Sequence, residues 1–531
     1  MKIRSSLVCL FVLAAAAAAV DWNAEGKRWW AHVQYLADDK LEGRETGSEG
    51  HRKAAAYVED RFREYSLKPA GTAGYLQPVR FDVRQIDEEH SSVELFENAK
   101  YVPLKFGEDL GVGLRTNPPA TLEAPAVFVG YGLSIPEAHY DDFAGLDLHG
   151  KIAVHLAGGP SSIPGPLRAH YSSTSERWKA LERAGAAGLV VIQNPKSMDI
   201  PWSRASLARF QPSMDLADRD LKEAPDQKLS LTLNPDRADR WIRSSGDHTL
   251  TELLALADAG KPLPRFNLGV KVRAKIAVKR WQVESQNVVG VLPGSDAQLK
   301  NEYVAISAHL DHVGVGMPIN GDKIYNGAMD NASGVASLLE TARGLKESGA
   351  APKRSILFVV VTGEEKGLLG SKYFVAHPTV ARKDIVADIN MDMFLPLYAL
   401  RYLEVQGLNE STLGDDVRAV AEAAGVQVQA DREPNRNLFI RSDQYRFIRA
   451  GIPALAFKFG SAPGSPEEKA AKDWLTKNYH APSDDANQPV DLEGAAQFNH
   501  IILQLTERVA NAAARPQWRE DSFFRRFVTG G

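Results

Sequence analysis

Three apolar runs without polar alternation constrain the fold more than any other feature of this chain. They are residues 303–309, 355–362 and 385–391. Strands of this kind are typical of a sheet that is covered on both faces. Between them, apolar residues recur at helical spacing over 333–346 and 368–375. This β-α-β-α-β order predicts an α/β fold with a doubly wound, mostly parallel sheet, whose ligand sites lie at the carboxyl ends of the strands.

Polar clusters follow these strands and recur once more near the end of the chain. They occupy residues 308–312, 327–334, 362–367, 390–393 and 479–485. They supply imidazoles and carboxylates but no thiolate, since the one cysteine of the chain is at position 9. Nitrogen and oxygen ligands suit Zn²⁺ and, less tightly, Mn²⁺ or Co²⁺. The clusters therefore predict a metal site at one edge of the sheet.

Each of these residues also has a plainer structural interpretation. His309 could be a satisfied core histidine, and Asp330 could cap the helix that begins at Ser333. Glu364 and Glu365 could form a solvated helix start, stabilised by the helix dipole. The shared position of the five clusters at strand ends favours a common site over these separate roles.

Several neighbouring residues are expected to support such a site rather than form it. Ser333 is expected to be an N-cap. His312 is expected either to contact the metal ligands without binding metal itself or to be exposed. Tyr479, Asp484 and Asp485 are expected to shape the loop around His480.

Composition and charge exclude several classes of protein. The chain has 531 residues, 44% hydrophobic and 24% charged, which is typical of a globular protein and not of a disordered or coiled-coil one. At roughly 150 residues per domain, this length predicts two or three domains. There are 63 Lys and Arg residues against 67 Asp and Glu, so the chain lacks the basic balance of a nucleic-acid-binding protein.

The first twenty residues have the pattern of a targeting signal. Lys2 and Arg4 precede an apolar run over 7–20 that contains six consecutive alanines at 14–19. This pattern predicts a cleaved secretory signal peptide, with an uncleaved anchor as the alternative. No later stretch is long enough to cross a bilayer. A secreted or periplasmic protein without a stable membrane span after cleavage is therefore expected.

In the second half of the chain, the polar clusters resemble the motifs of a known family. Five segments, taken in order, are similar to motifs of the M28 metallopeptidases, the di-zinc aminopeptidase superfamily that also contains glutamate carboxypeptidases: His309-Leu310-Asp311-His312, Met329-Asp330-Asn331-Ala332-Ser333-Gly334, Glu364-Glu365, Asn390-Met391-Asp392-Met393 and Tyr479-His480. The resemblance covers the N-terminal helices and residues 285–510. It implies the zinc-dependent exopeptidase fold.

The middle of the chain differs in composition: it is rich in proline and in short strand-like runs. It contains no recognisable cluster of catalytic residues. It resembles the protease-associated (PA) domain inserted in many members of that family, through residues 129–132, 150–153 and 184–188. The expected organisation has five parts: a signal peptide (1–20), an N-terminal part of the peptidase domain (21–115), an inserted β-rich PA-like domain (116–270), the peptidase catalytic domain (271–515) and a C-terminal tail (516–531).

The resemblance also implies roles for individual residues. Five side chains would bind two Zn²⁺ ions: His309, Asp330, Glu365, Asp392 and His480. Asp330 would bridge the ions, and Glu364 would be the general base. Asp311 would be the carboxylate that contacts the His309 ring without binding metal itself.

Elementary chemistry agrees with these roles. A carboxylate can span two ions, whereas an imidazole has one lone pair to give. The side chains of adjacent glutamates diverge in an extended turn, so one can bind metal while the other faces the water. Asp311 lies two residues after His309, so in extended chain both side chains point to the same side and the carboxylate can accept the imidazole N–H.

The expected function is that of a secreted zinc-dependent exopeptidase, an aminopeptidase, acting on a peptide substrate. Glutamate-carboxypeptidase-like or dipeptidase activity and glutaminyl cyclisation on the same fold are the enzymatic alternatives. A metal-free, receptor-type binding protein is the alternative from another class. Residues 441–445 resemble a substrate-lining loop of the family, but the sequence assigns them no role. The direction of cleavage, the side-chain preference, the role of the PA-like domain, the oligomeric state and the physiological metal stay open.

Overall fold

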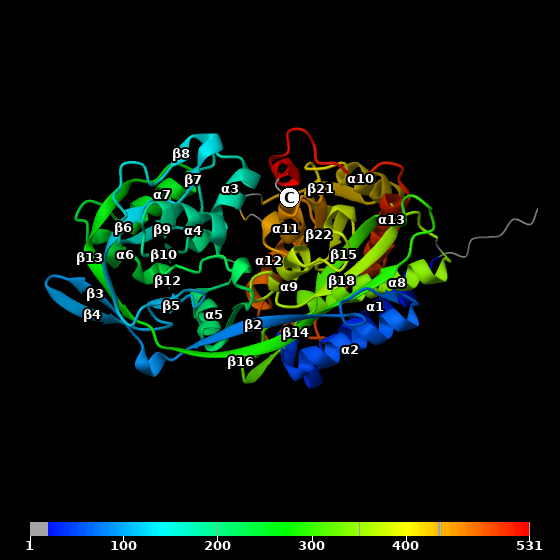
Figure 1. Ribbon diagram of the computed structural model, residues 1–531, viewed down its shortest axis with the longest axis horizontal. Helices are drawn as coiled ribbons and strands as arrows, with labels where there is room; N and C mark the ends of the chain where they lie inside the picture. Colours follow the sequence, from blue (N-terminus) through cyan, green and yellow to red (C-terminus); the bar gives the residue numbers. More distant parts are fainter. Residues whose placement is uncertain (1–19, 199, 350, 434–435, 437, 530–531) are drawn as a thin grey trace, which may run out of the picture.

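The chain forms two lobes that lie side by side (Figure 1). The computed structural model describes residues 20–198, 200–349, 351–433, 436 and 438–529. Within these residues each lobe is built on its own large sheet, one of ten strands and one of eight. The signal peptide expected over 1–20 lies outside the described residues, except for its last position.

The centre of the ten-stranded sheet is parallel. Its four central strands, in spatial order, are β18 (Ser355–Val361), β15 (Tyr303–His309), β19 (Ile385–Asn390) and β22 (Ala454–Gly460). Neighbours among them all pair in parallel, and His309 stands opposite Val361 in the register. Three of these strands are the apolar runs of the sequence, so the predicted α/β fold with a doubly wound sheet is confirmed, and their carboxyl ends meet at one edge.

Antiparallel strands extend this sheet on both sides, so the sheet as a whole is mixed. β14 (Val278–Leu292) pairs antiparallel with β18, and β20 (Tyr402–Gln406) pairs antiparallel with β22. The outer strands are β1 (Lys68–Pro69), β2 (Leu76–Ile86), β11 (Ser213–Leu216), β14 (Val278–Leu292), β20 (Tyr402–Gln406) and β21 (Gln427–Ala430).

Helices cover both faces of the parallel strands. Successive residues of β18 pack into different apolar cores, Phe358 on one face and Val359 on the other. The helices of the first face are α1 (Trp22–Leu36), α2 (Glu49–Glu64), α8 (Ser333–Glu347), α10 (Leu413–Ala423) and α13 (Leu492–Asn511). The second face is covered by α9 (Leu369–Ala376) and α11 (Gln444–Arg449). This double cover is the reason why the strands are apolar without alternation.

Helix α1 also supports the region where the polar clusters meet. Its Trp29 is fully buried, and the indole Nε1 donates to Ser333 O at 3.1 Å and to Ser337 Oγ at 3.1 Å. The N-terminal helix is therefore tied to the first turn of α8, directly after Asp330.

The second lobe contains the eight-stranded sheet. In spatial order its strands are β4 (Lys100–Leu104), β3 (Ser92–Glu97), β13 (Arg265–Lys275), β6 (Leu122–Val129), β9 (Ile152–Leu156), β10 (Gly188–Ile192), β12 (Leu229–Leu233) and β5 (Leu110–Val112). Its helices include α3 (Gly165–Ser172), α4 (Thr174–Arg183), α6 (Asp239–Arg243) and α7 (Leu250–Asp258). Two separate apolar cores lie against its strands.

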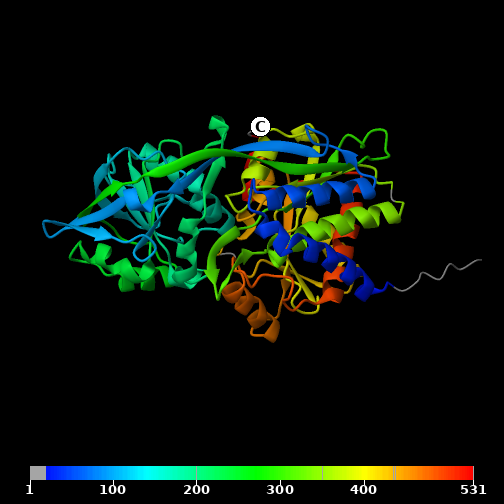
Figure 2. The same cartoon turned by 90° about the horizontal axis from the view of Figure 1, so that it is seen from below.

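The second sheet extends beyond the boundaries expected at 116 and 270. It takes in β3 to β5, from Ser92 onward, and continues to Lys275. The long antiparallel strands β2 and β14 run from one lobe into the other (Figures 1 and 2), while β11 returns from the middle segment to the larger sheet. The expected boundaries followed changes in proline content, which mark loops but do not say which sheet a strand joins.

The C-terminal segment lies at the junction of the two lobes. Its short 3₁₀ helix (Phe523–Thr529, red in Figure 1) contacts both α3 and α11. Arg526 of this helix forms an ion pair with Glu137 of the second lobe. No helix in the described part of the chain is both long and apolar enough to cross a membrane.

Candidate metal centre

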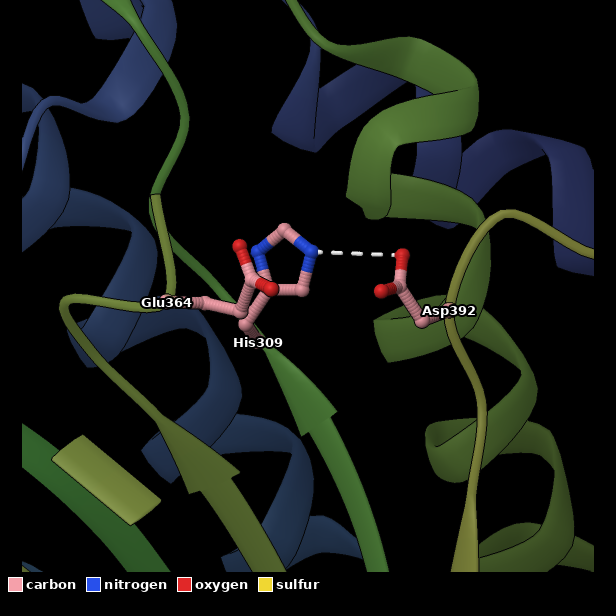
Figure 3. A group of neighbouring side chains, drawn as sticks. All are labelled: His309, Glu364 and Asp392. Carbon is pink, nitrogen blue, oxygen red and sulfur yellow. Dashed lines mark hydrogen bonds and ion pairs between the residues drawn. The ribbon is translucent and has the colours of Figure 1, made fainter. Parts of the chain in front are cut away.

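The ends of three parallel strands bring the first group of predicted residues together. His309 is the last residue of β15, while Glu364 and Asp392 follow β18 and β19 within a few residues. Figure 3 shows the His309 ring between these two carboxylates, each of which comes from a neighbouring loop. His309 Nε2 lies 3.4 Å from Asp392 Oδ1. Potential ligand atoms of the three residues all lie within 4.8 Å of one another.

Asp330 joins this group to a second one. It lies in a π-helical turn (Ala328–Ala332) that leads into α8, and its peptide bond with Asn331 is cis. Asp330 Oδ1 is 3.3 Å from His309 Nε2, and Asp330 Oδ2 is 3.3 Å from His480 Nε2. His480 Nε2 is in turn 3.1 Å from Glu365 Oε2. The two oxygens of one buried carboxylate thus face two different histidines.

The spacing of these atoms fits zinc. Two ligand atoms bound to one tetrahedral zinc ion at about 2.0–2.1 Å lie roughly 3.3 Å apart. The four separations around His309 and His480 are 3.3, 3.4, 3.3 and 3.1 Å. The donors are all imidazole nitrogens and carboxylate oxygens, which are zinc ligands. The five residues expected to bind metal therefore converge with a spacing that fits such ions on both sides of Asp330.

His312 belongs to the same cluster. It is fully buried, and its Nδ1 lies 2.7 Å from Glu365 Oε1 and 3.8 Å from Asp330 Oδ2. Of the two positions expected for it, the exposed one is wrong. The 2.7 Å separation is that of a hydrogen bond and is shorter than the spacing of two ligands on one zinc ion.

Asp311 differs from the expectation in what its carboxylate contacts. His309 Nδ1 is 3.1 Å from the backbone oxygen of Asp311 and 4.0 Å from its Oδ1. The carboxylate instead accepts hydrogen bonds from the backbone amides of Glu364 at 3.1 Å and Glu365 at 3.3 Å, and from Thr46 Oγ1 at 3.0 Å. The extended chain ends at His309, so the alternation that would place both side chains on one side does not continue to Asp311. Asp311 holds the glutamate turn rather than the imidazole.

The turn around Asp330 is held by side chains rather than by an N-cap serine. Ser333 is the first residue of α8, and its Oγ donates to Met329 O at 2.7 Å, so the expected N-cap role is wrong. The π-helical turn continues directly into α8, and Asn331 Oδ1 accepts the Gly334 amide at 3.0 Å instead. Asp484, which was expected to shape the loop around His480, accepts the amides of Met329 and Asp330 at 2.8 and 3.0 Å.

Arg44 also supports the cluster, although the sequence did not predict it. It lies in the polar loop between α1 and α2 and is fully buried. Its guanidinium donates to Leu310 O at 2.9 Å and to Gly327 O at 2.9 Å, and also to the carbonyls of Leu36 and Asn326. Arg44 therefore joins the chain after His309 to the chain before Asp330. No pattern in the sequence marks it, because its main partners are 266 and 283 positions away.

The cluster attracts positive charge. Burial by itself lowers the pKa of His480, but Glu365 and Asp330 offset this effect and raise the pKa to about 10. Burial likewise lowers the pKa of His309, yet Glu364 and Asp392 raise it well above its usual value. Burial raises the pKa of Glu364 well above its usual value, and Asp392 and Glu365 act in the same direction. Closely packed carboxylates of this kind need cations beside them.

The part of the chain that carries this cluster matches a known family. Residues 287–506 match the model of peptidase family M28. They include β15, β18, β19 and β22 and every residue of the cluster. The match covers less than half of the chain.

Curated relatives are similar over part of their length. A probable leucine aminopeptidase 2 of Aspergillus oryzae is 30% identical over 253 residues, which cover 44% of this chain and 45% of the relative. Aminopeptidase YwaD of Bacillus subtilis is 28% identical over 238 residues, covering 44% of this chain and 46% of the relative. Carboxypeptidase Q of Xenopus laevis is 28% identical over 169 residues, covering 31% of this chain and 34% of the relative. The chain therefore spans less than half the length of these relatives.

Solved structures share the fold along nearly the whole chain. An aminopeptidase from Aneurinibacillus sp. strain AM-1 is similar with a TM-score of 0.54 and 20% identity, covering 93% of this chain and 94% of that one. BSAP, a zinc aminopeptidase from Bacillus subtilis, is similar with a TM-score of 0.51 and 20% identity, covering 92% and 96%. At this level of identity the likeness concerns the fold.

Replacing Arg44 by lysine should weaken both the fold and the site. A lysine cannot reproduce the guanidinium fork, so carbonyls next to His309 and Asp330 lose their donors. We expect a loss of about 2–4 kcal/mol in the free energy of unfolding and a 10- to 100-fold loss, roughly, in zinc affinity. Urea unfolding and zinc titration measure the two effects. The exposed Arg52→Lys variant is the control, and equal behaviour of the two variants would contradict the role of Arg44.

Zinc binding should expel protons from the cluster. Since the pKa of His480 is about 10 without metal, its ring is protonated at neutral pH. Zinc binds a neutral imidazole, so about one to two protons per chain should be released, and affinity should rise with pH. Calorimetric zinc titrations in buffers of different ionisation enthalpy count these protons, with the exposed His90→Gln variant as control. Binding without proton release would mean that zinc binds elsewhere.

Proposed function

We propose that this protein is a zinc-dependent exopeptidase of the aminopeptidase type, which hydrolyses the N-terminal peptide bond of a peptide. The observation that carries this proposal is the position of Asp330, whose two oxygens each lie 3.3 Å from a different histidine. The match of residues 287–506 to the model of peptidase family M28 supports it. So do the names of the relatives, among them a probable leucine aminopeptidase and a zinc aminopeptidase.

Two sets of ligands that share Asp330 would hold the ions. We assign His309, Asp330 and Asp392 to one Zn²⁺, and Asp330, Glu365 and His480 to the other. When bound, two zinc ions would supply Lewis-acid activation of a water molecule and of the peptide carbonyl. The buried carboxylates offer the negative charge that such ions need, since Asp330 is 4% and Glu365 8% exposed at the side chain.

Glu364 is the residue that we assign as general base. Its carboxyl lines the same cavity as Asp330 and Asp392. Its backbone amide is held by Asp311, while no hydrogen bond from the described residues occupies its carboxylate. Burial raises the pKa of its carboxyl, and a raised pKa favours a group that takes a proton from the attacking water and returns it to the leaving amine.

Asp311 and His312 would act as positioning residues. Asp311 fixes the backbone of Glu364 and Glu365, so that one side chain faces the cavity and the other faces His480. His312 forms a hydrogen bond with Glu365 Oε1, so that Oε2 of the same carboxylate faces His480. Residues that orient ligands in this way typically change metal affinity or activity when they are replaced.

Two further parts of the proposal concern the rest of the chain. We propose that residues 1–20 are a secretory signal, because of their basic start and apolar run. We also propose that the second lobe corresponds to a PA domain, supported by the three short sequence matches between residues 129 and 188.

A panel of substrates tests the activity and its direction. With added zinc, we expect hydrolysis of aminoacyl-p-nitroanilides and no hydrolysis of N-acetylated dipeptides, and chelation should abolish turnover. Cleavage of the acetylated dipeptides alone would contradict an aminopeptidase and favour a carboxypeptidase. Conversion of N-terminal Gln peptides to pyroglutamate would instead show a cyclase. A zinc-free protein without turnover would point to a receptor-type protein.

Replacing Glu364 by glutamine separates the base from the ligands. The amide cannot take a proton, so kcat should fall by at least about 100-fold, while zinc content stays unchanged. The control is Glu493→Gln, at an exposed position of α13. Loss of zinc in Glu364→Gln would make Glu364 a ligand, and unchanged turnover would refute its role as base.

A further inference from the structure

The cavity beside the metal cluster has a charged composition that hydrolysis alone does not require. Its acidic lining residues are Asp330, Glu364 and Asp392, all assigned above to metal binding or proton transfer. Its other charged lining residues, His480 apart, are the cations Lys458, Arg441 and Arg436. Among the described lining residues, no carboxylate is left over for a substrate ammonium group.

Lys458 is the most informative of these cations. It lies on β22 opposite Glu404 of β20, and its side chain lines the cavity. Burial lowers the pKa of Lys458, and the negative charges of Asp392 and Glu404 act in the opposite direction. In the described part of the chain, no side chain lies within hydrogen-bond or ion-pair distance of its ammonium group.

Other partly buried lysines of this chain have carboxylate partners. Lys366 pairs with Glu45 at 3.0 Å, and Lys222 pairs with Asp82 at 2.7 Å. Lys458 is partly buried. An ammonium group in a cavity wall without a carboxylate partner is unfavourable, which favours a partner that arrives with the ligand.

Arg441 adds a second cation near Lys458. Its side chain lines the same cavity, and its positive charge lowers the pKa of Lys458. Tyr479 directly precedes His480 and lines the same cavity. A lysine and an arginine that line one cavity provide positive charge that attracts a carboxylate.

We propose that this cavity binds a carboxylate of the substrate through Lys458, with Arg441 beside it. The inference rests on the proposed function and narrows its substrate class to peptides with a carboxylate close to the scissile bond. Two sources share this chemistry: the α-carboxylate of a dipeptide, and the side chain of an acidic residue.

Matched substrate pairs distinguish the two sources. Leu-Gly against Leu-Gly-amide tests the α-carboxylate, and Glu-p-nitroanilide against Gln-p-nitroanilide tests the side chain. We expect kcat/KM to be at least about tenfold higher for the charged member of one pair, since hydrogen bonds between charged groups are the strong ones. Lys458→Met should lower kcat/KM for that member by roughly 10- to 100-fold and leave its neutral counterpart within about threefold.

Further variants separate charge from folding. Lys458→Arg keeps the charge and should retain part of the preference, and Lys53→Met, at an exposed position of α2, should change nothing. Thermal melting and zinc content identify a variant that fails to fold. Calorimetric binding of glutarate to the zinc-loaded protein is a readout independent of turnover, and it should weaken at least about tenfold in Lys458→Met.

The outcomes separate this inference from the proposed function. If neutral and charged substrates are hydrolysed equally and Lys458→Met changes neither, the carboxylate site is refuted while the peptidase activity stands. If no peptide is hydrolysed, the proposed function fails, and the glutarate titrations decide the inference. Equal glutarate affinity in the wild type and in Lys458→Met overturns the proposed carboxylate site.

Discussion

The carboxylate of Asp330, held between two histidines, is the interaction on which the rest of the site depends. His309 reaches it from the end of β15, and His480 reaches it from the loop after α12 (Pro466–Lys477). This single buried aspartate lies between two imidazoles, and each imidazole has a further carboxylate nearby. The cluster therefore has a deficit of positive charge. Two divalent ions would remove that deficit, whereas a plain hydrogen-bonded core would leave carboxylates facing one another.

The scaffold holds this arrangement through backbone contacts. Arg44 binds carbonyls on both sides of the cluster, Asp484 binds the amides of the Asp330 turn, and Asp311 binds those of the glutamate turn. These three charged residues are fully buried, and each one ties together segments far apart in the sequence. The precise placement of ligand atoms therefore depends on polar contacts around the loops as well as on the parallel sheet beneath them.

The sequence predicted the parts that follow from local patterns. Apolar runs located β15, β18 and β19 to within a residue or two, and parallel pairing then brought their polar ends to one edge. Long-range contacts could not be read in this way. Arg44, the partners of Asp311 and the cations around Lys458 depend on which distant segments meet, and the strands from Ser92 onward carry no local sign of the sheet that they join.

Anomalous diffraction at the zinc edge, from crystals of the zinc-loaded protein, would show whether Asp330 is shared by two ions. We expect two peaks about 3.5–4 Å apart, with one oxygen of Asp330 about 2.0–2.2 Å from each. A single peak, or two peaks that do not share Asp330, would contradict the proposed metal centre.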